Sequence, residues 1–164
     1  MRKRILIVVV LALLASLMCV PVTAVAGESP HHYPVSGEWS FWGTEMVVDK
    51  AVDGNLFFHG SEHGAWAGTF GGTSTDYFFG KISKDGYLWA IITVNFEGCV
   101  GEACGQAVFR ISVYAPTDAP MYGRWTIVNG SGGLEHLHGM GTWVFTGGDA
   151  IGYADYEGEY WLLH

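Results

Sequence analysis

The segment from Gly123 to Phe145 reads GRWTIVNGSGGLEHLHGMGTWVF, and it decides the class of the fold. A cluster of turn residues at 129–133 and a short segment at 134–137 separate two apolar stretches. Large apolar residues that alternate on either side of such turns are typical of antiparallel strands. The segment therefore predicts a hairpin-like unit whose alternating residues are mainly core residues: Trp125, Ile127, Trp143 and Phe145.

The rest of the chain repeats this composition. It holds 24 glycines, seven tryptophans, eight tyrosines and nine phenylalanines in 164 residues, a mixture that disfavours helices and favours pleated strands. Residues 87–96 form the longest expected strand, and residues 107–115 alternate cleanly, with glycine-containing loops expected at 60–64 and 98–105. About nine short strand segments in one domain fit an all-β, closed and mostly antiparallel barrel, because closure removes exposed sheet edges.

The first 26 residues have the features of a secretory signal peptide. Basic residues at 2–4 precede an apolar run from Ile5 to Val20, and Ala24-Val25-Ala26 is a typical cleavage site. We therefore expect a signal peptide at 1–26, a flexible leader at 27–36 and the barrel domain at 37–164, in a protein that is secreted or otherwise extracytoplasmic. An uncleaved N-terminal anchor is the alternative interpretation.

The chain that follows the cleavage site is strongly acidic. Its sixteen acidic residues face only five basic ones, which gives a formal net charge of about −11. A surface of this sign repels phosphate backbones, so we expect no nucleic-acid partner. No second apolar segment of membrane-helix length follows, so we expect no membrane span in the mature chain.

One pattern resembles a known family. Glycines recur around Trp125 and Ile127, a Gly130-Ser131-Gly132 turn precedes Leu134 and Leu137, and an aromatic strand follows near the C-terminus. This pattern resembles the allene oxide cyclase-like barrel superfamily, and in particular its small uncharacterised microbial members. The resemblance covers residues 37–163 and implies about eight strands around a largely apolar interior. It implies no activity, and no catalytic residue is carried over from it.

Two cysteines remain once the signal peptide is removed. Cys99 and Cys104 lie in a glycine-flanked segment of a chain that we expect to be exported. An oxidising compartment favours a disulfide between them. A redox-active pair and half of a metal site are the alternatives, although no second cysteine pair is present to complete such a site.

Four histidines form two close pairs that are weak candidates for metal ligands. They are His59 with His63, and His136 with His138. Residues two apart on a strand share a face, and neutral imidazoles suit zinc or copper. If both pairs lay at one end of a barrel, four ligands could converge. Solvated loop histidines are the simpler interpretation, so we expect neither a metal nor another cofactor.

The aromatic residues are either packing or the lining of a ligand cavity. Small barrels fill their interiors with large side chains, whereas a partly filled interior can hold an apolar ligand. The inward alternation makes four residues the candidates for ligand contact: Leu88, Ile92, Phe109 and Ile111. The sequence therefore predicts a binding or structural module for a small apolar ligand. A cyclase or isomerase that holds an apolar substrate in the cavity is the alternative, and a β-sandwich for surface adhesion is a third.

Overall fold

The computed structural model describes residues 30–163, and these residues form strands and turns but no helix. The elements in chain order are β1 (Tyr33–Val52), β2 (Asn55–Gly68), β3 (Phe70–Ile82), β4 (Leu88–Val100), β5 (Ala103–Ala115), β6 (Tyr122–Gly132), β7 (Leu137–Gly147) and β8 (Ile151–Leu162). The described part of the chain accordingly offers no helix of the length and hydropathy that a membrane span requires.

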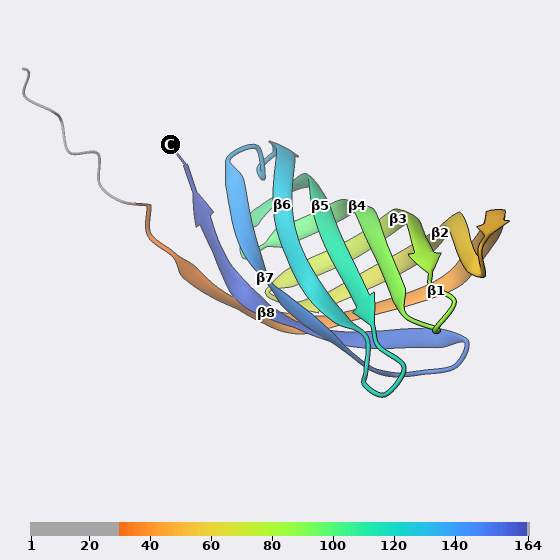
Figure 1. The fold of residues 1–164 in the computed structure, drawn as a ribbon. Coiled ribbons are helices and arrows are strands. Elements are labelled where there is room, and N and C mark those ends of the chain that lie inside the picture. The colour runs from red at the N-terminus through yellow and green to blue at the C-terminus, as the bar shows by residue number, and fades with distance from the viewer. Residues whose placement is uncertain (1–29, 164) are drawn as a thin grey trace, which may run out of the picture.

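The eight strands close into a ring. Each strand pairs antiparallel with its neighbour in the chain, and β8 returns to pair with β1 (Figure 1). This arrangement confirms the predicted all-β class, the antiparallel pairing and the closure. We call the end that holds the β1–β2, β3–β4, β5–β6 and β7–β8 connections the open end. The opposite end, with the β2–β3, β4–β5 and β6–β7 connections, is the closed end.

Aromatic side chains fill the half of the interior that lies toward the closed end. We call this cluster the aromatic plug, and its members are Trp66, Phe70, Phe96, Phe109, Trp125 and Tyr156. Neighbouring rings in it lie 5.2 to 6.3 Å apart, which is the usual spacing of packed aromatic pairs. Leu134 of the β6–β7 connection and Leu137 at the start of β7 are also buried at this end.

The predicted core residues of the opening segment are inside. Trp125, Ile127 and Trp143 are buried, and Phe145 is partly buried against the same core. The indole nitrogen of Trp125 donates to the carbonyl oxygens of Thr142 and Glu157, at 3.1 and 3.2 Å. Trp125 is therefore buried without an unsatisfied donor.

The expected loops at 60–64 and 98–105 were wrong. Residues 60–64 lie in the middle of β2, and within 98–105 only Gly101 and Glu102 form a turn, between the paired ends of β4 and β5. Gly60 and Gly98 do not end strands but make room beside large rings. A Cβ on Gly60 would collide with the ring of Phe78, and one on Gly98 would collide with the ring of Phe96.

The barrel also begins earlier than the expected boundary at residue 37. Strand β1 starts at Tyr33, which pairs with Tyr160 of β8, and the two rings stack 5.1 Å apart. Residues 33–36 are therefore part of the sheet, because their backbone completes the ladder with β8. The expected signal peptide at 1–26 lies outside the described residues.

The predicted disulfide between Cys99 and Cys104 is confirmed. The two residues are register partners at the closed end, on the last turn of the β4–β5 hairpin, and their Cα atoms are 4.0 Å apart. The bond joins two strands that are already paired, so it fixes the hairpin that forms this part of the closed end.

A bulge changes the direction of β1 near the open end. Trp42 pairs with His63 and Glu45 pairs with Ser61, so Gly43 and Thr44 both stand opposite Glu62. Gly43 has a φ of 65°, a conformation that glycine adopts without steric cost. Pairing with β8 ends at Trp42, and beyond the bulge β1 pairs with β2 alone.

Candidate functional site

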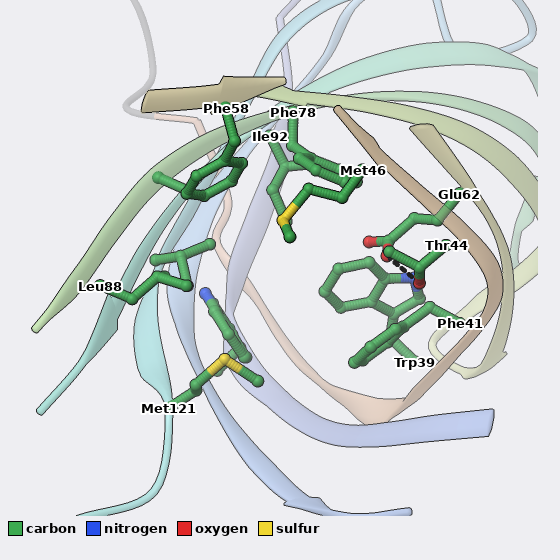
Figure 2. Close-up of a pocket in the computed structure, with 13 residues that line it drawn as sticks. Trp39, Phe41, Thr44, Met46, Phe58, Glu62, Phe78, Leu88, Ile92 and Met121 are labelled. Carbon is green, nitrogen blue, oxygen red and sulfur yellow. Dashed lines mark hydrogen bonds between the residues drawn. The ribbon is translucent and has the colours of Figure 1, made fainter. Parts of the chain in front are cut away.

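A cavity of about 210 Å³ occupies the half of the interior that lies toward the open end. Its wall is almost entirely apolar and comes from most strands of the ring (Figure 2). The lining residues are Trp39, Phe41, Thr44, Met46, Phe58, Glu62, Phe78, Leu88, Ala90, Ile92, Val113, Met121 and Trp143. Apolar walls with a few polar groups are characteristic of small-molecule sites.

The bulge in β1 brings two of these residues into the cavity. Before the bulge the odd-numbered residues Trp39 and Phe41 face inward, whereas after it the even-numbered Thr44 and Met46 do so. A one-residue insertion of this kind moves a strand's side chains to the opposite face. Met46 from β1 and Met121 from the β5–β6 connection lie at the rim, where their flexible side chains can adapt to a ligand.

Glu62 is the one carboxyl group among the lining residues. It lies on β2 between Phe58 and Trp66, so it marks the boundary between the cavity and the aromatic plug. Only 6% of its surface is exposed, and its Oε2 accepts a hydrogen bond of 3.1 Å from the hydroxyl of Thr44. Burial raises the pKa of Glu62 from 4.5 to about 7, against the smaller opposing effect of that hydrogen bond.

Asp76 lies beside Glu62 on the inward face of β3, since the two are register partners. Its side chain is fully buried, and neither carboxyl oxygen has a hydrogen bond of good geometry within residues 30–163. Burial raises the pKa of Asp76 to about 7. The nearby Ser74 hydroxyl lowers it somewhat, and the negative charge of Glu62 raises it further.

The space around Gly64 collects further polar atoms. A Cβ on Gly64 would collide with the Ser74 hydroxyl and the Trp39 indole nitrogen, and would come within 3.1 Å of Asp76 Oδ2. The Ser74 hydroxyl accepts from Trp66 Nε1 at 3.0 Å, whereas Trp39 Nε1 is buried with no acceptor in the described chain. We call this set the polar layer: Trp39, Glu62, Ser74 and Asp76.

The predicted ligand contacts fall into two groups. Leu88 and Ile92 line the cavity, as expected from the inward face of β4. Phe109 and Ile111 also point inward, but they are buried against the plug and the neighbouring strands and do not line the cavity. The interior at their level is filled, so only the part of each inward face toward the open end remains available to a ligand.

The histidine pairs do not converge. His59 and His63 lie on the outer face of β2, and His59 Nδ1 is 2.7 Å from Asp49 Oδ1. His136 and His138 lie at the closed end, where His138 stacks on Trp161. Within residues 30–163 no group of three or more His, Cys, Asp or Glu side chains is arranged to hold a metal ion.

The sequence did not identify the polar layer. No motif in the sequence marks Glu62, Asp76 or Thr44 as a site residue. The available signal was the alternation of β3, which places Asp76 on the same face as Phe78 and Gly80. A carboxyl group on the inward face of a strand predicts a buried acid, because barrel strands alternate between inside and outside.

The chain matches no known family model and no curated protein. Among solved structures it is similar to a protein of unknown function from the DUF3224 family of Shewanella oneidensis MR-1. That likeness has a TM-score of 0.62 and 16% identity, over 82% of this chain and 99% of that one. A second likeness is to the pterocarpan synthase dirigent protein GePTS1, with a TM-score of 0.51 and 12% identity, over 87% of this chain and 95% of that one.

At these identities the likenesses bear on the fold alone. They support a β-barrel fold, and they do not specifically support the allene oxide cyclase-like superfamily over other barrels.

Proposed function

We propose that this protein is a binding module that takes a small, mainly apolar ligand into the cavity at the open end of the barrel. The observation that carries the proposal is the cavity itself, about 210 Å³ of apolar-walled space above a tightly packed plug. A dry apolar cavity of about 150 Å³ is enough to bind benzene in another protein. The cavity therefore suits a ligand of one ring and a short substituent.

The proposal includes export of the protein, with cleavage after Ala26. The confirmed Cys99–Cys104 disulfide supports it, because such bonds persist mainly in oxidising compartments. Intact-mass analysis of protein recovered outside the cytoplasm should give a chain that begins at Gly27. A full-length chain found only in the cytoplasm would contradict export.

Binding is tested by filling the cavity. Ala90 is buried in the cavity wall, and Ala90→Leu places three additional carbon atoms in the space that a ligand would use. Thr93→Leu on the exposed outer face of the same strand is the matched control. We expect benzyl alcohol, followed by NMR titration, to bind the native protein and the control but to bind Ala90→Leu at least tenfold more weakly. Equal binding to all three would place the ligand elsewhere.

A cyclase or isomerase is the second candidate, and the Glu62 carboxyl favours it. An acid whose pKa lies near 7 can both give and take a proton at neutral pH, and it faces an apolar cavity that excludes water from a substrate. The wild-type protein should then accelerate hydrogen–deuterium exchange at the α carbons of cyclohexanone, and Glu62→Gln should not. Exchange at the same rate in both proteins would contradict the enzymatic function and would not affect the proposed binding function.

A further inference from the structure

We propose that the ligand is an apolar amine, bound as a monocation with its ammonium group at Glu62 and its hydrocarbon part among the aromatic rings of the cavity. This inference rests on the proposed binding function, and it adds the chemical class of the ligand.

The polar layer holds two carboxyl groups and no positive partner. All five basic side chains outside the N-terminal segment lie on the outer face or in turns: Lys50, Lys81, Lys84, Arg110 and Arg124. The two ion pairs within residues 30–163 join outer histidines to Asp49 and Glu159. Buried charges in proteins are normally paired, so a carboxylate at this position needs a cation from outside the chain.

The two carboxyl groups together match a single positive charge. Glu62 and Asp76 are register partners on neighbouring strands and face the same interior space, so one proton shared between them leaves one negative charge. Asp76 is fully buried with both oxygens unpartnered in the described chain, whereas Glu62 reaches the cavity. Glu62 is therefore the group that meets the ligand, and Asp76 retains the proton.

The cavity wall favours an organic cation over a metal ion. Two carboxyl groups and one threonine hydroxyl supply fewer oxygen ligands than calcium requires, and the rest of the wall is apolar. The rings of Trp39, Phe41 and Trp143 line the same space, and the first two are labelled in Figure 2. Aromatic faces attract ammonium groups and also accept the hydrocarbon part of such a ligand. The net negative charge of the mature chain draws cations toward the barrel.

The test compares benzylamine with benzyl alcohol, which has the same shape and no charge. The protein as recovered from expressing cells is titrated by calorimetry at pH 8. Its affinity for the amine should be at least about tenfold higher than its affinity for the alcohol. Benzoate, of the same size and opposite charge, should bind more weakly than the alcohol. Equal affinity for the amine and the alcohol would overturn the inference and leave the binding function standing. Binding of none of the three would overturn the binding function itself.

Two matched variants identify the carboxyl that acts. Glu62→Gln should lose the preference for benzylamine over benzyl alcohol. Asp76→Asn removes the other carboxyl and should keep the preference, since Glu62 then ionises more readily. Loss of the preference in Asp76→Asn alone, with Glu62→Gln unaffected, would contradict the assignment. Retained binding of benzyl alcohol shows that each variant is folded.

If a variant does not fold, the pH dependence of benzylamine binding to the wild-type protein tests whether a carboxylate binds the amine. Asp76 of β3 is the titratable group beside Glu62, and β1 presents only Thr44 and Trp39 to it. The other lining residues are apolar. The affinity for benzylamine should rise about tenfold from pH 6 to pH 8, as the carboxyl pair loses a proton while the amine keeps its own. Benzyl alcohol should show no such rise, and a flat profile for the amine would overturn the inference.

Discussion

The two ends of this barrel are built from the same strands but have opposite interiors. Toward the closed end most inward positions hold a ring or a branched side chain, and the aromatic plug fills the interior. Toward the open end the inward positions include Ala90, two methionines and the carboxyl of Glu62, and a cavity remains. The packing of the closed end stabilises the barrel, which allows the open end to keep an imperfectly packed and partly polar interior.

The largest expected effect comes from removing the centre of the plug. Trp125→Ala deletes a side chain that is 1% exposed and satisfied at its nitrogen, so it should lower the free energy of unfolding by about 3–5 kcal/mol. Denaturant unfolding measures the change. Trp42→Ala, which removes a ring that is 37% exposed near the open end, is the control and should cost far less. A near-neutral Trp125→Ala would mean that the plug does not carry the stability.

The next effect is a loss of stability as the pH rises. Folding raises the pKa of both Glu62 and Asp76 to about 7, from ordinary values of 4.5 and 3.8, so the folded state binds protons that the unfolded state has released. The two protonated carboxyl groups make their full contribution to the free energy of unfolding below about pH 4, and this contribution declines until the pH passes 7. Above that pH each carboxyl has lowered the free energy of unfolding by on the order of 3 kcal/mol relative to its value at low pH.

Thermal or denaturant unfolding between pH 4 and pH 8 measures this slope. Glu62→Gln should flatten it, because the amide does not titrate, whereas Glu97→Gln on the exposed outer face of β4 should leave it unchanged. A stability that rises through this range in the wild-type protein would show that the pair is ionised at low pH and that the polar layer is not desolvated.

The disulfide is expected to contribute less than the plug. It closes a short loop, with a sequence separation of 5, so replacing both cysteines by serine should cost about 2 kcal/mol. Because the bond lies at the closed end, the binding of benzyl alcohol at the open end should not change. Weaker ligand binding in the double variant would show that the two ends are coupled.

The smallest effect concerns the bulge in β1. Thr44→Val removes the hydroxyl that donates to Glu62, and that hydrogen bond lowers the pKa of the carboxyl. The pKa of Glu62, followed by carbon-13 NMR of its carboxyl group, should therefore rise further, with a change in stability of about 1 kcal/mol or less. Thr126→Val on the exposed face of β6 should leave it where it was. An unchanged pKa in Thr44→Val would mean that the bulge does not present Thr44 to the cavity.

The sequence predicted the closed end better than the open end, for a physical reason. The alternation of β4 and β5 identified their inward faces, and the spacing and compartment of the cysteines predicted the disulfide, because both are local signals. The prediction of a loop at the glycines of β2 was wrong, because the sequence alone does not distinguish a glycine that makes room for a ring on another strand from a glycine that forms a turn.

The polar layer depends on register, which no local pattern carries. Glu62 and Asp76 are neighbours only because β2 and β3 run as long uninterrupted strands from the turn at Thr69. The cavity depends in addition on the bulge at Gly43, which adds one residue to β1 opposite a single residue of β2. Both features follow from how whole strands pair, so they appear only once the ring is assembled.

The extra residue in β1 offsets the alternation of inward and outward side chains by one position. Before Gly43 the odd-numbered side chains of β1 face inward, and after it the even-numbered Thr44 and Met46 do so. The offset lies where β8 stops pairing with β1, so only β2 pairs with the part of β1 that follows it. Deleting Gly43 would leave Thr44 alone opposite Glu62, and Thr44 and Met46 would keep their inward positions in a strand that no longer bulges there.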